Sequence, residues 1–252
     1  MNEGIKIAIL DMYNGHTNEG MRCIKTITGR FLAQENIEGN YDIFDVRQKN
    51  ELPDLSYDIY ISSGGPGNPA PQGDVWETPF YALLDGIWNY NLKPENEQKK
   101  YLFLVCHSFQ VAADHWGLGK VCKRRTTSFG IFPMHRTLIG HDEVLFQNLP
   151  ELFYAVDSRD YQLIEPNLNQ LDKWGQIFCV LKKIDRILHS NEPSWPFGFR
   201  NRFLVHNSTQ KPMRRVCCGI LPKLKNVTIL LKTMVRKNTM TWCVHCEIQK
   251  KL

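Results

Sequence analysis

The sequence predicts an α/β protein whose open parallel sheet carries helices on both faces. Short apolar runs alternate with segments of helical spacing between residues 5 and 116. Such alternation is typical of parallel sheets, in which helices connect successive strands. The chain of 252 residues is 42% apolar, so it can bury a core of the size that this fold needs.

Each element of this fold has its own pattern. Apolar runs predict the strands, which are 5–10, 41–46, 57–62 and 101–105. Helical spacing of apolar residues predicts the helices, which are 18–34, 75–90 and about 109–116. In such sheets the working site lies at the carboxyl ends of the strands. We therefore expect the segments that follow residues 62 and 105 to lie close together.

The segment "SGGPG" at 63–67 follows the third predicted strand. Its glycines allow a turn, or a loop whose exposed backbone N–H groups hold an anion. Proline follows at positions 66, 69 and 71, so no helix can open directly after the glycine pair. A phosphate site at a helix terminus is therefore not expected here.

The segment "VCHSFQ" at 105–110 places Cys106 between the fourth strand and a helix. A sharp strand-to-helix turn holds its central residue with the side chain exposed, as nucleophilic cysteines require. The start of a helix also lowers the pKa of a thiol. A buried structural cysteine is the alternative, because cysteine is often found in cores.

The charge of the chain changes near residue 185. Residues 1–185 hold 18 basic and 24 acidic side chains, whereas residues 186–252 hold 13 and 2, together with four of the eight cysteines. We predict a domain over 1–185 and a basic, cysteine-rich, poorly ordered tail over 186–252. We expect reduced thiols, no secretory signal and no membrane span, and hence a cytoplasmic protein.

Three motifs in this order resemble the class I glutamine amidotransferases, in particular the glutaminase part of GMP synthase. They are "ISSGGPG" at 61–67, "VCHSFQ" at 105–110 and "TSFGIFPMH" at 127–135. The resemblance covers about residues 4–185. It implies a flavodoxin-like fold and the family's reaction, in which glutamine is hydrolysed and the ammonia passes to an acceptor.

The resemblance also implies roles for five residues. Cys106 would attack the side-chain amide of glutamine and form a glutamyl thioester. The backbone N–H groups of Gly65 and His107 would hold the oxyanion that this attack creates. Gly64 and Gln110 would contact the bound glutamine.

The turn around the cysteine departs from the family pattern at two positions. The family has glycine two residues before and two residues after its nucleophile, where this chain has Leu104 and Ser108. We interpret this as a divergent subgroup in which other residues keep the shape of the turn.

The segment "SRDYQLIEP" at 158–166 is interpreted as a loop at a strand end. In the family such a loop approaches the substrate, so Arg159, Asp160 and Tyr161 would contact glutamine or a partner subunit. A solvent-exposed polar loop is the alternative that the sequence favours.

The family mechanism needs a His-x-Glu pair late in the domain, in which the histidine deprotonates the thiol. His245 and Glu247 have this spacing and are a candidate acid/base pair, but only five residues follow Glu247. That is too short for the helix that would pack behind the site. A solvated tail is therefore the favoured alternative for this segment.

A one-base slip near Ile184 to Arg186 offers another explanation of the tail. When 205–221 is re-read one base back, permitted codons can spell Phe-His-Pro-Glu-Ala-Asp, which contains the missing motif. In this hypothesis the tail is out-of-frame translation, and the chain lacks its catalytic base.

The tail also contains cysteines that invite a zinc interpretation, namely Cys217, Cys218, Cys243 and Cys246. Two adjacent cysteines cannot readily complete a tetrahedral clamp. We therefore expect no metal, no cofactor and no nucleic-acid partner.

The predicted function is that of a glutamine amidotransferase that supplies ammonia to a separate synthetase, with activity in doubt because the His-x-Glu pair is missing. Two alternatives stay open. One is a cysteine hydrolase of another amide or γ-glutamyl substrate, and the other is a catalytically dead binding or regulatory module.

Overall fold

Four parallel strands form the sheet on which the candidate site is built. The computed structural model describes residues 4–34, 38–136, 150–167, 169–170, 176–182 and 202–206. The strand order is β2-β1-β3-β4, and the strands are β1 (Ile5–Asp11), β2 (Gly39–Asp45), β3 (Ile59–Ser62) and β4 (Tyr101–Leu104). The helices are α1 (Glu19–Gln34), α2 (Val46–Lys49), α3 (Glu77–Leu92) and α4 (His107–His115).

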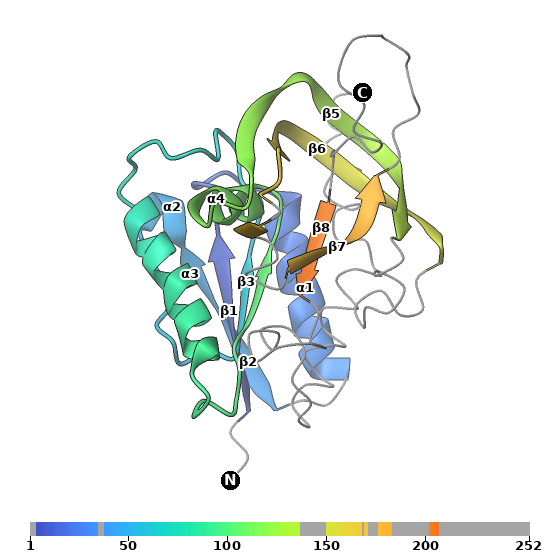
Figure 1. The fold of residues 1–252 in the computed structure, drawn as a ribbon. Coiled ribbons are helices and arrows are strands. Elements are labelled where there is room, and N and C mark those ends of the chain that lie inside the picture. Colours follow the sequence, from blue (N-terminus) through green and yellow to red (C-terminus); the bar gives the residue numbers. More distant parts are fainter. Residues whose placement is uncertain are drawn as a thin grey trace.

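Helices cover both faces of this sheet (Figure 1). Successive side chains of a strand point to opposite faces. In β1, Ile7 and Ile9 pack with α1, whereas Ala8 and Leu10 pack with α3 and α4. Burial on both faces explains why residues 7–10 of this strand are all apolar instead of alternating with polar residues. The predicted flavodoxin-like α/β fold is confirmed.

A second sheet, which the sequence analysis did not predict, extends beyond the carboxyl ends of the parallel strands (Figure 1). It is antiparallel in the order β6-β5-β7-β8. Its strands are β5 (Lys120–Arg136), β6 (Leu152–Ile164), β7 (Gln176–Lys182) and β8 (Arg202–His206). The interpretation of 158–166 as a loop is therefore wrong, because residues 158–164 are paired within β6.

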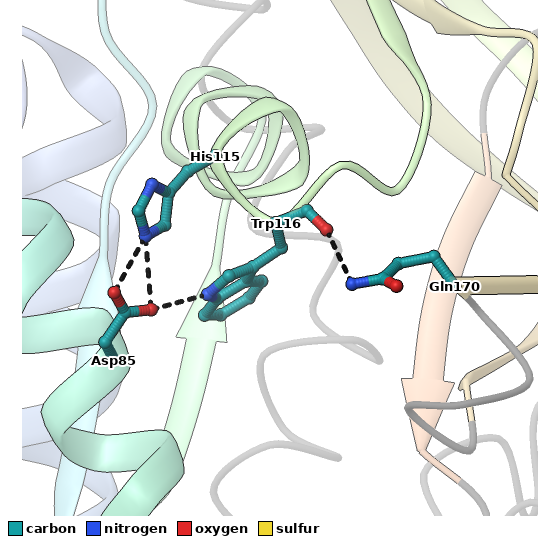
Figure 2. A network of polar contacts seen from close by, with 4 residues as sticks. All are labelled: Asp85, His115, Trp116 and Gln170. Atoms are coloured by element: carbon teal, nitrogen blue, oxygen red, sulfur yellow. Dashed lines mark hydrogen bonds and ion pairs between the residues drawn. The ribbon is translucent and has the colours of Figure 1, made fainter.

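Polar contacts join the helices to the segment that follows β6 (Figure 2). Asp85 on α3 accepts a hydrogen bond from Nε1 of Trp116 at 3.0 Å, and its other carboxylate oxygen lies 3.0 Å from Nε2 of His115. The carbonyl of Trp116 accepts a bond of 3.2 Å from Nε2 of Gln170. The imidazole of His115 stacks on Tyr81 with 4.3 Å between ring centroids. One cluster thus holds α3, the end of α4 and the later chain together.

The predicted tail contains strand β8, and its other residues lie outside the described part of the chain. The candidate pair His245 and Glu247 and the four tail cysteines fall there. Within the described residues, none of the helices has the length and apolar character needed to cross a membrane.

Candidate functional site

Cys106 occupies a sharp turn between β4 and α4. Its backbone has φ 50° and ψ −100°, and α4 begins at the next residue. A positive φ is uncommon for a residue other than glycine and is held only where the surroundings enforce it. Nucleophile elbows place their reactive residue at such a strand-to-helix turn. The local backbone therefore has the form that a cysteine nucleophile needs.

Ser108 explains how this turn forms without glycine two residues after the cysteine. Its side chain is fully buried, and its hydroxyl oxygen accepts a bond of 3.1 Å from the N–H of Val105. The same hydroxyl lies 3.2 Å from the carbonyl of Ser62 at the end of β3, to which it can donate. The serine thus closes the turn with hydrogen bonds and ties it to the neighbouring strand.

The glycine loop after β3 packs directly against this turn. A Cβ atom at Gly64 would lie 3.6 Å from the Cβ of Cys106 and 3.2 Å from the phenol oxygen of Tyr13. At Gly65, a Cβ would lie 2.3 Å from the carbonyl oxygen of Met12, which is a clash. Position 65 therefore has room only for glycine, and the loop and the cysteine lie side by side as expected.

The orientation of one peptide in this loop is fixed by Ser63. Its hydroxyl donates a hydrogen bond of 2.8 Å to the carbonyl of Gly64 and accepts one of 2.9 Å from the N–H of Met12. The C=O and N–H of a trans peptide point in opposite directions. The N–H of Gly65 therefore points away from the buried Ser63.

Charged side chains from the second sheet act on the thiol. Burial raises the pKa of Cys106, Arg159 lowers it and Asp157 raises it, while the N–H of His107 lowers it by donating to the sulfur. Nε of Arg159 lies 2.7 Å from Oδ1 of Asp157. Oδ2 of Asp157 accepts a hydrogen bond of 2.5 Å from the hydroxyl of Ser128. The thiol is thus kept in its neutral form unless a base or substrate changes its surroundings.

The imidazole of His107 is poorly suited to act as that base. Burial, helped by the charge of Arg47, lowers the pKa of His107 to about 4. Within the described residues its Nε2 atom is buried without a hydrogen-bond partner. The neutral ring is a weak proton acceptor at pH 7. The role expected for its backbone N–H stays a prediction.

Gln110, which was expected to contact glutamine, is buried one turn along α4. Its Nε2 donates a hydrogen bond of 3.1 Å to the carbonyl of Tyr161 on β6. The amide therefore joins helix α4 to the second sheet in this structure, and its contact with a substrate stays a prediction.

The described site brings together six of the expected residues, which are Gly64, Gly65, Cys106, His107, Gln110 and Arg159. It adds Arg47 and Asp157, which no motif indicated because each reaches the site from another element. Within the described residues, no group of three or more His, Cys, Asp or Glu side chains is arranged to hold a metal ion.

No protein-family model matches this chain, and no curated protein matches it. Among solved structures, the fold is similar to that of a glutamine amidotransferase from Thermotoga maritima, with a TM-score of 0.55 and 10% identity over 94% of this chain and 99% of that chain. It is also similar to the glutaminase domain of Trypanosoma brucei CTPS with bound acivicin, with a TM-score of 0.50 and 14% identity over 92% and 94% of the two chains. The likeness shows a shared fold.

Proposed function

We propose that this chain is a glutaminase of the class I glutamine amidotransferase type, which cleaves glutamine to glutamate and ammonia. One observation carries the proposal: Cys106 has a positive φ at the turn into α4, and the backbone of Gly64 packs against its side chain. The fold shared with a glutamine amidotransferase of Thermotoga maritima supports this choice of reaction.

The proposed reaction has two steps. The thiolate of Cys106 attacks the carbonyl carbon of the glutamine side-chain amide, and a C–S bond forms. The N–H groups of Gly65 and His107 stabilise the oxyanion. The C–N bond then breaks, and the nitrogen leaves as ammonia after it takes up, through water, the proton that the thiol gave up before its attack. Water hydrolyses the thioester, which releases glutamate and restores the thiol.

The charges beside the thiol fit an amino-acid substrate. Arg159 and Asp157 present opposite charges within one ion pair, both partly buried on β6. Their charges complement the α-carboxylate and α-ammonium groups of glutamine, and partly buried charges bind more strongly than exposed ones. In this proposal the ion pair opens when the substrate binds.

The fate of the ammonia forms part of the proposal. We infer that a separate synthetase of the GMP synthase kind accepts it. Turnover is expected to be slow, because burial raises the pKa of Cys106, and loss of a general acid/base typically lowers rates by about 10²- to 10⁴-fold. A reagent that captures the thiol in a single step is therefore a better probe than ammonia release alone.

The test is covalent labelling with the chloromethyl ketone analogue of glutamine, followed by intact-mass analysis. We expect one adduct on the unmodified chain, protection by glutamine but not by asparagine, and no adduct on Cys106→Ala. Ammonia release is measured in parallel for both proteins. Labelling that glutamine does not prevent would contradict glutamine as substrate and favour a hydrolase of another amide. A thiol that reacts no faster than free cysteine would instead identify an inert binding module.

A further inference from the structure

The side chain of Arg47 lies behind the glycine loop of the proposed site. Arg47 belongs to α2, which follows the edge strand β2. Its Nη1 donates a hydrogen bond of 2.6 Å to the carbonyl of Pro66 in the loop and one of 3.2 Å to the carbonyl of Met12 after β1. The guanidinium carbon lies 5.4 Å from the centre of the Trp76 ring. One half-buried cation thus connects the chain after β1 with the chain after β3.

The contacts of this guanidinium extend along the whole loop. Nη1 lies 3.3 Å from the position of a Cβ at Gly65, and Nη2 lies 3.7 Å from that position at Gly67. The carbonyl of Pro66 points to Arg47, so the N–H of Gly67 points the other way. Ser63 fixes the peptide between Gly64 and Gly65 in the same manner. The half-buried Arg47 and the buried Ser63 therefore set the orientation of two peptides of this loop.

Arg47 also acts on the residue that follows the cysteine. Its charge adds to burial in keeping the imidazole of His107 neutral. Within the part of the chain that the structure describes, Nε of Arg47 and Nε2 of His107 are both buried without a hydrogen-bond partner. The same cation therefore influences both backbone segments whose N–H groups are expected to bind the oxyanion.

We propose that Arg47 is a positioning residue that holds the oxyanion loop in place behind Cys106. This inference rests on the proposed function of the site. Arg47 touches no reacting atom, and it acts through the Pro66 and Met12 carbonyls. A planar guanidinium suits this task because its fork of donors can bind two acceptors at fixed angles, whereas a lysine ammonium is a single point charge.

Two variants separate the effect of the guanidinium's several hydrogen-bond donors from the effect of the positive charge of Arg47. Arg47→Met removes both, and Arg47→Lys keeps the charge alone. Lys100→Met is the matched control, because Lys100 is also buried, donates to a backbone carbonyl at 2.9 Å and lies 4.5 Å from the Tyr90 ring centre. Lys100 precedes β4 and therefore lies at the opposite end of that strand from Cys106.

Two reagents report on different parts of the site. The chloromethyl ketone of glutamine has a carbonyl that the oxyanion loop must hold, whereas iodoacetamide needs only the thiolate. In both Arg47 variants we expect the maximal rate of Cys106 labelling by the chloromethyl ketone to fall by about 100-fold, because a small misplacement of catalytic groups has an effect of this size. The concentration of chloromethyl ketone that gives half of the maximal rate should be nearly unchanged. The rate of Cys106 alkylation by iodoacetamide should stay within about threefold of that of the unmodified chain. Lys100→Met should change neither the chloromethyl ketone rate nor the iodoacetamide rate.

Hydrogen exchange gives a measurement that does not depend on chemistry at Cys106. The amides of Ser63, Gly64, Gly65 and Gly67 should exchange faster in both Arg47 variants than in the unmodified chain or in Lys100→Met. NMR titration of His107 should show a raised pKa in Arg47→Met and an unchanged one in Arg47→Lys, because only the first variant loses the charge. Unchanged exchange in the loop together with an unchanged chloromethyl ketone rate would overturn the inference.

The failure of this inference can be told apart from failure of the proposed function. If the unmodified chain shows no glutamine-protected labelling, the proposed reaction is wrong, while faster exchange at 63–67 in both Arg47 variants still supports the positioning of the loop. If labelling is protected in the unmodified chain but neither Arg47 variant alters its rate or the hydrogen exchange of the loop, the reaction stands and Arg47 has no positioning role.

Discussion

The side-chain amide of Gln110 donates a hydrogen bond of 3.1 Å to the backbone carbonyl of Tyr161. Gln110 lies on the helix that begins after the cysteine, and Tyr161 lies on the strand that carries Arg159. Because the bond is buried, it fixes the second sheet relative to the thiol. The charge beside Cys106 therefore depends on a contact between helix α4 and strand β6 of the second sheet.

Replacing Gln110 with leucine should weaken this junction. The variant leaves the carbonyl of Tyr161 without its partner, so we expect the free energy of unfolding to fall by about 1–3 kcal/mol in urea denaturation. If Gln110 instead serves only to bind glutamine, stability will stay unchanged and the chloromethyl ketone will require a higher concentration for half-saturation.

The two members of the ion pair on β6, Arg159 and Asp157, should shift the pKa of Cys106 in opposite directions. Arg159→Met removes a charge that lowers the pKa of Cys106, and Asp157→Asn removes one that raises it. The midpoint of iodoacetamide alkylation against pH should therefore move up in the first variant and down in the second. Arg22→Met, at an exposed position on α1, is the control and should leave the midpoint in place. Equal midpoints in all four proteins would contradict this arrangement.

Loss of the Ser108 hydroxyl should loosen the turn at Cys106. In Ser108→Ala, the N–H of Val105 and the carbonyl of Ser62 each lose their bond to the hydroxyl and keep only the bond of 3.0 Å that joins them to each other. We expect a loss of about 1–2 kcal/mol of stability and slower labelling of Cys106 by the chloromethyl ketone. Thr26→Ala removes a comparable hydroxyl bond on the exposed side of α1 and should cost less than about 0.5 kcal/mol. Equal losses in the two variants would contradict a special role for Ser108.

His107 should make the protein less stable in mild acid. The unfolded chain protonates this imidazole at its ordinary pKa of 6.5, whereas the folded chain does so only at about 4. The unfolded state therefore binds the extra proton in this window, and stability falls as the pH drops from 6.5 towards 4. The difference corresponds to about 3 kcal/mol. In His107→Phe, the free energy of unfolding measured across the same pH range should not show this fall. If it falls with pH as steeply as in the unmodified chain, His107 does not contribute.

The proposed one-base slip predicts a specific result from the gene. Resequencing around the codons for Ile184 to Arg186 should recover a frame that encodes Phe-His-Pro-Glu-Ala-Asp, and the protein made from that frame should release ammonia from glutamine faster than the present chain. An uninterrupted frame that encodes the present tail in several isolates would refute the slip.

The parallel sheet could be predicted from the sequence because its inner strands, β1 and β3, are buried on both faces. Residues 7–10, for example, form an apolar run without interruption, and all four are fully buried. A strand that is covered on both faces does not show the alternation of polar and apolar residues found in a half-exposed strand. Strand β5 was missed because its first half carries four basic residues and two threonines. No apolar alternation marks such a segment, and only pairing with β6 defines it as a strand.

The candidate site was predictable in its backbone and less so in its side chains. Cys106 and Gly64 were indicated because they follow strands that end at one edge of the sheet. Arg47 could not be found in this way, because its role depends on a hydrogen bond from α2 to the loop after β3, and these segments are far apart in the sequence. Ser108 looked like a departure from a glycine, and only its hydrogen bonds show how a serine can serve there.

The backbone of Cys106 also restricts which amino acids evolution could place at this position. At φ 50°, a side chain branched at Cβ meets severe steric hindrance. Threonine is therefore excluded as a substitute nucleophile, whereas serine would fit the same turn. A chain that descends from this one has two routes at position 106: it can keep an unbranched nucleophile, or it can give up the reaction and relieve the turn with glycine.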